Sequence, residues 1–334
     1  MSYTCYLSLG ANLGDRAESL RQALRLITQI PRTSLTQVSS FYITEPWGNT
    51  DQPAFLNAAA AVRTTLPPPD LLRALQAIEQ RLGRVRHEHW GARTIDIDLV
   101  YAGSVEWQTP ELQLPHPYLT KRAFVLVPLA ELAPDLCIAD RPLTSWLSEP
   151  AIAAERSTMR LSADVPLPQA LSLIACIDAH GGLSYQGQLL FDLPDDLAFF
   201  RAKTTGGIVI MGYGTYASLP GRRPLLERDN IVLTRHHDPQ GFIACRGLTE
   251  LRAKLFTIQL PRQRAWVIGG AGIYRLLLPY TDDVWLTRVE ATKKADRYLP
   301  PLDGFEQREI KPGPASNPAY AYYHYIRQQV PTNI

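Results

Sequence analysis

The sequence lacks the features of a secreted, membrane-spanning or polyanion-binding protein. Its longest apolar stretch, near FVLVPLAELA, has about half the length that a helix needs to cross a bilayer. The N-terminal MSYTCYLSLG contains no basic segment followed by an apolar core and a cleavage site, which argues against a secretory leader. The 34 basic and 32 acidic residues are mixed and give a net charge of +2, so no concentrated field attracts nucleic acid. We therefore expect a cytoplasmic protein with small-molecule substrates and no nucleic-acid or membrane partner.

Cysteine is also scarce. The four cysteines lie far apart in the sequence and show no paired spacing, namely Cys5, Cys137, Cys176 and Cys245. This distribution argues against both a zinc site and a disulfide framework, so we expect reduced thiols that are mostly buried.

The length and the change of pattern along the chain predict two domains. A chain of 334 residues with 46% apolar content is too long for one ordinary core. Between residues 148 and 170 the sequence turns to Ala, Ser, Glu and Pro, which is typical of a connector. We predict a first domain at 1–160, a linker at 161–169 and a second domain at 170–334. Irregular alternation of strands and helices predicts an α+β sandwich for the first domain. Regular alternation predicts an α/β second domain with a mainly parallel sheet.

A pair of aspartates in the first domain is a candidate metal site. The segment from residue 93 to residue 101 alternates as a strand, which places Asp96 and Asp98 on one face and Ile95, Ile97 and Leu99 in the core. Two carboxylates about 7 Å apart are costly without a cation, and Mg²⁺ prefers such oxygen ligands. A solvent-facing strand with two harmless acids remains the alternative on this pattern alone.

The basic residues around this strand favour a polyphosphate ligand. Several of them lie within a dozen residues of it or on the loop that follows, namely Arg84, Arg86, Arg93, His116 and Arg122. Guanidinium groups beside a metal ion suit polyphosphate oxygens. Surface ion pairs are the alternative, since that is the usual role of an arginine.

Four segments of the first domain carry a family resemblance: SSFYITEPWG, DQPAFLNAA, GRVRHEHWGARTIDIDLVY and LPHPYLTKRAFVLVPL. In this order they resemble 6-hydroxymethyl-7,8-dihydropterin pyrophosphokinase over residues 3–147. The resemblance implies a ferredoxin-like sandwich, with ATP as a substrate and Mg²⁺ held by Asp96 and Asp98. It implies ATP contacts at Gln76, Glu79, Arg84, Arg86, Arg93, His116 and Arg122, with Arg84 and Arg93 acting on the transferring group. It implies pterin contacts at Thr44, Phe55, Asn57 and Phe124. We also predict that Trp90 contributes to the pterin site and helps the arginine loop to close.

The second domain offers one acid and two glycine-containing turns. In LPDDLAFF, Asp196 and Phe200 project from the same face of a predicted helix. A carboxylate among apolar neighbours needs a donor, such as the amino and ring N–H groups of a pteridine, although a role in favouring the helix N-terminus is the alternative. The turns VIMGYGTY and WVIGGAGIY allow phosphate to approach, but each is equally consistent with a structural turn.

Taken in order, LSLIACIDAHGGLS, LPDDLAFF, VIMGYGTYASLPGR, RDNIVLTR, WVIGGAGIY and VWLTRVEA resemble dihydrofolate reductase over residues 171–328. The resemblance implies hydride transfer from NADPH to a pterin, assisted by Asp196. It implies folate contacts at Ile174, Cys176, Asp196, Phe200, Arg228 and Thr287. It implies cofactor contacts at Thr215, Thr234, Arg235, Ile268, Gly269, Gly270 and Tyr274. The active-site loop departs from the family pattern at Ser184, Leu190 and Phe191, and Tyr213 stands where a basic residue is common.

Together the two resemblances predict a bifunctional enzyme of folate biosynthesis, a kinase of the transferase class joined to an oxidoreductase. Two alternatives stay open at this stage. The second domain could be a non-catalytic module for NADPH binding or assembly, or it could reduce another pterin. The sequence also leaves open whether identical chains assemble.

Overall fold

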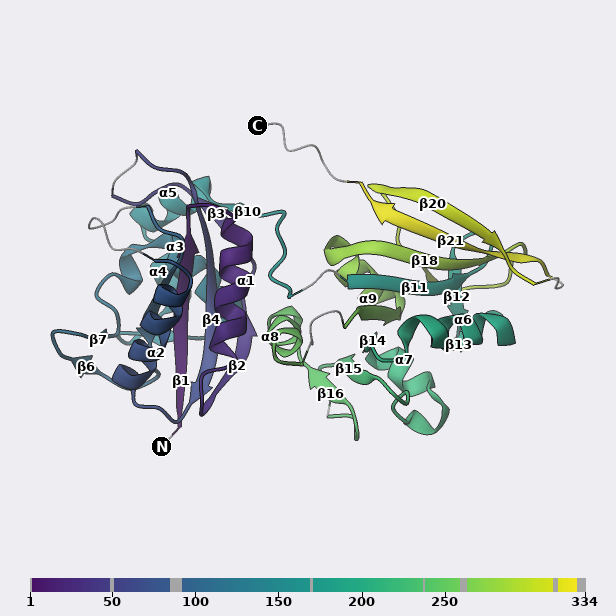
Figure 1. The fold of residues 1–334 in the computed structure, drawn as a ribbon, viewed down its shortest axis with the longest axis horizontal. Helices are drawn as coiled ribbons and strands as arrows, with labels where there is room; N and C mark the ends of the chain where they lie inside the picture. Colours follow the sequence, from purple (N-terminus) through teal and green to yellow (C-terminus); the bar gives the residue numbers. More distant parts are fainter. Residues whose placement is uncertain are drawn as a thin grey trace. The chain divides into compact units, whose positions relative to one another are not determined.

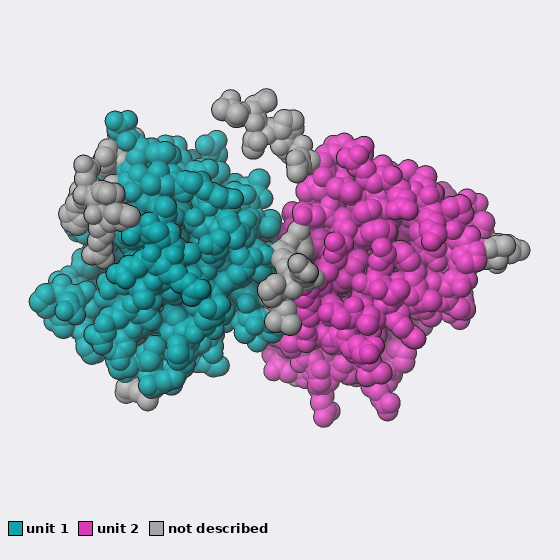
Figure 2. Space-filling model, viewed as in Figure 1, with its two compact units in different colours: residues 1–168, 248–258 teal, residues 169–247, 259–334 magenta. Residues whose placement is uncertain are grey.

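The computed structural model of the chain describes residues 2–48, 51–84, 92–168, 171–236, 238–258, 263–314 and 318–328. The chain forms two compact units, coloured separately in Figure 2. Unit 1 contains residues 1–168 and 248–258, and unit 2 contains residues 169–247 and 259–334. Among the described residues, none of the helices combines the length and the apolar character needed to cross a membrane.

Unit 1 is built on a six-stranded antiparallel sheet with the order β10-β3-β4-β1-β5, in which β2 also pairs with β4 (Figure 1). The strands are β1 (Tyr3–Ala11), β2 (Thr33–Val38), β3 (Tyr42–Thr44), β4 (Phe55–Thr64), β5 (Asp96–Tyr101) and β10 (Arg160–Leu161). Two short hairpins accompany the sheet, β6 (Trp107–Gln108) with β7 (Gln113–Leu114) and β8 (Cys137–Ile138) with β9 (Arg141–Pro142). The helices are α1 (Arg16–Ile27), α2 (Pro68–Arg81), α3 (Ala123–Leu132), α4 (Leu143–Leu147), α5 (Pro150–Thr158) and α8 (Leu248–Ile258), with a 3₁₀ turn at Leu119–Lys121.

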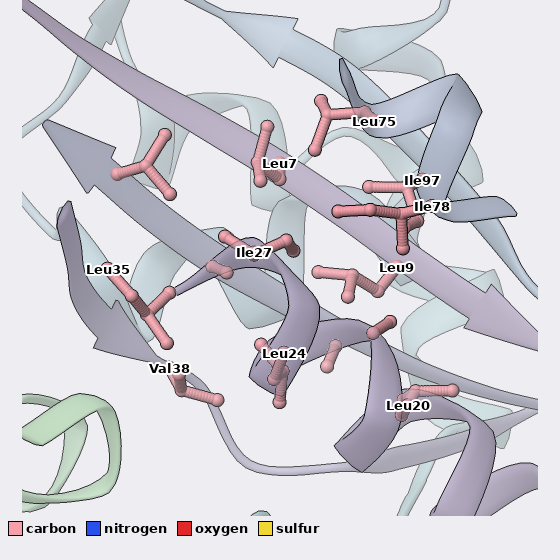
Figure 3. Close-up of a cluster of buried hydrophobic side chains, with 14 of the residues drawn as sticks. Leu7, Leu9, Leu20, Leu24, Ile27, Leu35, Val38, Leu75, Ile78 and Ile97 are labelled. Atoms are coloured by element: carbon pink, nitrogen blue, oxygen red, sulfur yellow. The ribbon is translucent and has the colours of Figure 1, made fainter. Parts of the chain in front are cut away.

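Helix α1 is set by its local sequence. The side chain of Asp15 caps α1 by accepting the backbone N–H of Glu18 at 2.9 Å. The apolar side chains of α1 recur at three- and four-residue steps and pack against β1 and β4, as Figure 3 shows for Leu20, Leu24 and Ile27. Helix α2 adds Leu75 and Ile78 to the same core. The same cluster contains side chains of β1 and β5, so the two helices pack against the strands that carry the first candidate site.

The region predicted as a connector is more ordered than its composition indicates. Helix α5 covers residues 150–158, and β10 pairs with β3 at Arg160↔Ile43 and Leu161↔Tyr42. Ile152 is 3% exposed and joins a second core under α3. A short helix at residues 151–156 was already possible from the sequence, whereas the pairing of β10 with β3 depends on a distant segment and leaves no local pattern.

Unit 2 is built on an eight-stranded sheet with the order β16-β15-β14-β17-β11-β18-β21-β20. Its pairs are parallel from β16 to β18 and antiparallel from β18 to β20. The strands are β11 (Leu171–Ile177), β14 (Ile208–Gly212), β15 (Asp229–Leu233), β16 (Ile243–Cys245), β17 (Ala265–Gly269), β18 (Thr281–Val289), β20 (Phe305–Pro312) and β21 (Tyr320–Arg327). A small sheet contains β12 (Gly182–Tyr185), β13 (Gln188–Leu189) and β19 (Arg297–Tyr298). The helices are α6 (Pro194–Thr204), α7 (Tyr213–Ser218) and α9 (Ala271–Leu277), with 3₁₀ turns at Pro220–Arg222 and Leu278–Tyr280.

All four cysteines are free. Cys5 and Cys245 are buried, Cys176 is half-buried and Cys137 is exposed. The expectation of unpaired thiols is therefore confirmed, although only two of the four are fully buried.

Candidate active sites

The two carboxylates of the first candidate site lie on β5. Ile97 and Leu99 are each 2% exposed, whereas Asp96 and Asp98 are half-buried on the opposite face. The predicted alternation is therefore confirmed, but the strand begins at Asp96 and not at residue 93. The backbone of Arg93 bonds instead to Asn12: its N–H donates to Asn12 Oδ1 at 2.8 Å, and its carbonyl accepts the Asn12 N–H at 3.1 Å.

Asp96 is neutralised by two guanidinium groups. Arg84 Nη1 lies 2.6 Å from Asp96 Oδ1, and Arg93 pairs with the other oxygen. Arg84 also pairs with Glu79, which is 3% exposed and accepts the Ile97 N–H at 2.7 Å. Glu79, predicted on the nucleotide side of the site, thus anchors Arg84 to β5.

Asp98 lies beside Asp96 on β5 and carries a perturbed carboxyl group. Burial and the neighbouring Asp96 carboxylate raise the pKa of Asp98. Within the described part of the chain, no group of three or more His, Cys, Asp or Glu side chains could hold a metal ion. Two carboxylates supply only part of an octahedral oxygen shell, which fits Mg²⁺ that arrives with phosphate oxygens and water.

Arg122 and His116 both interact with the charge of Asp96, and Arg122 also interacts with that of Asp98. The Arg122 guanidinium lies 4.6 Å from the ring centroids of both Trp47 and Tyr118. Its Nε is buried and has no hydrogen-bond partner among the described residues, which fits a phosphate oxygen. Burial, and then the Arg122 charge, lower the pKa of His116 to about 4, so its ring is neutral at pH 7. His116 Nδ1 accepts the backbone N–H of Tyr118 at 3.1 Å, which leaves Nε2 as a donor.

The predicted pterin contacts Thr44 and Asn57 lie on the neighbouring strands β3 and β4. Asn57 Nδ2 donates to Thr44 Oγ1 at 2.7 Å, and both residues are almost fully buried. The strand register places Asn57 opposite Gly10, and Gly10 opposite Asp96. Asn57 on β4 and Asp96 on β5 therefore lie at the same level of the sheet, on either side of β1. The predicted residues Phe55, Gln76 and Phe124 are half-buried in this unit, whereas Arg86 and Trp90 lie outside the described residues.

The second candidate site is centred on Asp196, in the first turn of α6. The Thr287 hydroxyl donates to Asp196 Oδ1, and the Cys176 thiol also bonds to this carboxyl. Cys176 and Thr287 are paired in register on β11 and β18. Burial raises the pKa of Asp196, while the two side-chain donors oppose this shift. The structure thus brings together three side chains that the sequence placed in one pocket.

Arg228 lies at the opposite end of the same helix. Its Nε donates to Thr204 Oγ1 at 2.8 Å, and Nη2 donates to Thr205 Oγ1 at 2.9 Å and to the Arg201 carbonyl at 3.2 Å. At a rise of 1.5 Å per residue, the helix separates Asp196 from this end by about 12 Å. Phe200 and Ile174, also predicted in the folate pocket, belong to one hydrophobic cluster.

The predicted cofactor residues gather where the parallel strands β14, β15 and β17 end. A Cβ atom added to Gly269 would lie 2.8 Å from Thr215 Oγ1, so the two segments approach as closely as glycine allows. The φ angle of Gly269 is 141°, which also disfavours other residues. Thr234 is buried at the end of β15 and Arg235 beside it is exposed. The hydroxyl of the buried Tyr274 donates to the Ile174 carbonyl at 2.9 Å, which ties α9 to β11, while Ile268 and Gly270 flank Gly269.

Comparison with known proteins gives the first part of the chain a family. The family model described as 7,8-dihydro-6-hydroxymethylpterin-pyrophosphokinase matches residues 6–134. A pyrophosphokinase of Pseudomonas aeruginosa is 48% identical over 135 residues, which are 40% of this chain and 83% of that protein. Its counterpart in Methylorubrum extorquens is 45% identical over 144 residues, which are 43% of this chain and 91% of that protein. The chain belongs to the pyrophosphokinase family.

The rest of the chain matches a second family. The dihydrofolate reductase family model matches residues 170–328. A solved structure of dihydrofolate reductase from Enterococcus faecalis, complexed with NADP(H), shows 28% sequence identity and a TM-score of 0.43, covering 48% of this chain and 97% of that one. The two family models therefore match the chain in the order that the sequence predicted, the pyrophosphokinase model over residues 6–134 and the dihydrofolate reductase model over residues 170–328.

Sequence reasoning missed two residues that shape these sites. In the pyrophosphokinase site, Gly10 allows close approach of β4, because a Cβ atom there would lie 2.6 Å from Asn57 Oδ1. In the reductase domain, Asp178 is 1% exposed and accepts the backbone N–H groups of His180 and Gly182 at 2.8 and 2.7 Å. It also accepts the N–H of Lys293, at 3.3 Å, and so joins two loops. The sequence near Gly10 or Asp178 does not indicate these roles, because Gly10 is constrained by Asn57 and Asp178 bonds to Lys293, which are both distant in the chain.

We expect Gly10→Ala to weaken pterin binding in the pyrophosphokinase site. The added methyl group would displace the Asn57 amide from Thr44, and misplacement of a contact by about 1 Å can cost up to about 100-fold. The KM for the pterin should rise about tenfold or more, while the KM for ATP changes little. Initial rates of AMP formation at varied pterin concentration measure this effect.

Gly247→Ala is the matched control for this substitution, because nothing lies within 4 Å of the Cβ atom that it adds. An unchanged pterin KM in Gly10→Ala would show that the close approach at Asn57 does not matter for the substrate.

Proposed function

We propose that the chain catalyses two reactions of folate biosynthesis. The first transfers a diphosphate from Mg-ATP to 6-hydroxymethyl-7,8-dihydropterin and releases AMP. The second reduces 7,8-dihydrofolate to tetrahydrofolate with NADPH. The observation that carries the first reaction is the placement of Asp96 and Asp98 one strand from the Thr44–Asn57 pair. Such an arrangement holds a nucleotide polyphosphate beside a heterocycle that offers amide-like donors and acceptors.

In the first reaction the protein acts mainly by positioning and by charge neutralisation. We infer that Asp96 and Asp98 hold Mg²⁺, which neutralises the phosphate oxygens of ATP when it is bound. Arg84 and Arg93 stay close to the transferring group because Asp96 and Glu79 fix them. Arg122 donates its unpaired Nε–H to a phosphate oxygen, and His116 contributes a neutral donor.

In the second reaction the substrate extends along α6. The pteridine would bind at Asp196, Cys176 and Thr287, and the glutamate carboxylate would bind at Arg228, about 12 Å away along the helix. Because burial raises the pKa of Asp196, this carboxyl keeps its proton at a higher pH than an exposed aspartate does. NADPH supplies the hydride. Thr215, Thr234, Arg235 and the Gly269–Gly270 turn would hold it at the strand ends.

Two features support a finer description of unit 1 as a ferredoxin-like sandwich. The order β1-α1-β2 is followed by β4-α2-β5, which repeats one strand–helix–strand unit. In the sheet, β4 lies between β1 and the β2/β3 edge, and these pairs are antiparallel.

Two assays on one purified chain test the proposal. Pterin-dependent formation of AMP from Mg-ATP tests the first activity, and dihydrofolate-dependent oxidation of NADPH, followed spectrophotometrically, tests the second. Activity in the first assay without activity in the second would favour a non-catalytic second domain. Reduction of another pterin, but not of dihydrofolate, would change the substrate assignment.

A further inference from the structure

Helix α8 carries a buried arginine in an unexpected place. The helix lies within the stretch that matches the reductase family, yet it packs as part of unit 1 (Figure 2). Its residues Ala253 and Phe256 join the core of unit 1, which also contains Leu35 and Val38. Figure 3 shows this helix, in green, beside Val38 at the edge of that core. Arg252, on the same helix, is only 3% exposed.

The Arg252 guanidinium bonds to groups of unit 1. Its Nη1 donates to the Val38 carbonyl and to Glu131 Oε2, each at 3.4 Å, and its Nη2 donates to Ser40 Oγ at 3.2 Å. A buried guanidinium requires an opposite charge and bonded donors, and Glu131 supplies the charge. The side chain therefore has a defined place in unit 1 and does not only fill space.

Glu131, the partner of Arg252, also bonds to β3. Its carboxylate accepts the Tyr42 hydroxyl at 2.6 Å and the Ser40 backbone N–H at 3.0 Å. Glu131 therefore holds both the first residue of β3 and the segment just before it. Tyr42 is paired with Asn57 in the sheet, and β3 ends at Thr44. Glu131 itself lies near the end of α3, whose second residue is Phe124.

We propose that Arg252 is a positioning residue for the pterin end of the pyrophosphokinase site. Through Glu131 it holds β3, which carries Thr44, and α3, which carries Phe124. The inference rests on the proposed pyrophosphokinase function. It means that a residue inside the reductase-like stretch of sequence sets the substrate affinity of the other activity.

The test compares Arg252→Met with Lys254→Met, which removes a half-buried cation from the same helix. In the full-length chain, Arg252→Met should raise the KM for the pterin about tenfold, while the KM for ATP and the reductase rate change less than about twofold. Lys254→Met should leave all three values near those of the unmodified chain. Equal increases in both KM values, or an unchanged pterin KM, would overturn the inference.

Two further variants keep the test decisive if Arg252→Met folds poorly. Arg252→Lys retains the charge and should recover part of the pterin affinity, which a purely steric role would not produce. The double variant Arg252→Met with Glu131→Gln should raise the pterin KM no further than the larger single effect, because the two residues act as one unit. Additive effects would overturn the connection. An unmodified chain without pterin-dependent AMP formation would instead overturn the proposed function, and this result is distinct from a failure of the variants alone.

Discussion

Replacing Asp98 with alanine is expected to lower pyrophosphokinase turnover about 1000-fold even at saturating Mg²⁺, a loss of about 4 kcal/mol of transition-state stabilisation. Asp98 and Asp96 share one half-buried face of β5, and Asp96 is already paired with Arg84 and Arg93. Without Asp98, one carboxylate engaged with two arginines would have to hold the metal ion. Turnover is measured as AMP formation at increasing Mg²⁺.

The reductase activity of the same chain is the internal control for this variant. It should stay within about twofold of the unmodified value, because Asp98 lies in unit 1 and the hydride-transfer residues lie in unit 2. Glu106→Ala removes an exposed carboxylate from the loop after β5 and should leave both activities intact. Full pyrophosphokinase activity of Asp98→Ala at saturating Mg²⁺ would remove Asp98 from the metal site.

Asp196→Asn is expected to lower the rate of dihydrofolate reduction about 100- to 1000-fold, since general acid assistance contributes about 10²- to 10⁴-fold. The amide preserves the shape and can still accept a hydrogen bond from Thr287. It cannot, however, carry the negative charge or supply the proton. NADPH oxidation at saturating dihydrofolate measures the loss, and AMP formation by the same sample shows that the chain is folded. A rate within about threefold of the unmodified enzyme would exclude Asp196 as the acid.

The pH dependence of the reductase follows from the same carboxyl. Burial raises the pKa of Asp196, so the protonated form persists to higher pH than for an exposed aspartate. The rate should be highest below this pKa and should fall as the pH rises through it. Cys176→Ala removes a donor that opposes the shift, so the pKa should rise further and the fall should move to higher pH. The two pH–rate profiles, recorded with the same substrate, test the sign. A shift to lower pH would contradict it.

Local patterns determined much of the fold in advance. Asp196 and Phe200 lie on one helix, α6, as predicted, because helical spacing is set by residues close in the chain. Asp15 caps α1 for the same reason. The paired face of Asp96 and Asp98 also followed from a period of two. The predicted start of the strand at residue 93 was wrong because a distant residue is involved: the backbone N–H of Arg93 bonds to the Asn12 side chain, and β5 begins only at Asp96.

The sequence by itself determined the two families, the three candidate acids Asp96, Asp98 and Asp196, and the strand or helix that carries each of them. These features can be read from the sequence because each turn, strand face or helix start is formed by a few residues that are close together in the chain. Only the tertiary structure decided that Gly10 must stay small and that Arg252, from the reductase-like stretch of sequence, belongs to unit 1. Gly10 is constrained by Asn57, and Arg252 meets Glu131 121 positions away in the chain. Such pairings depend on how distant segments pack, and no pattern within one segment records them.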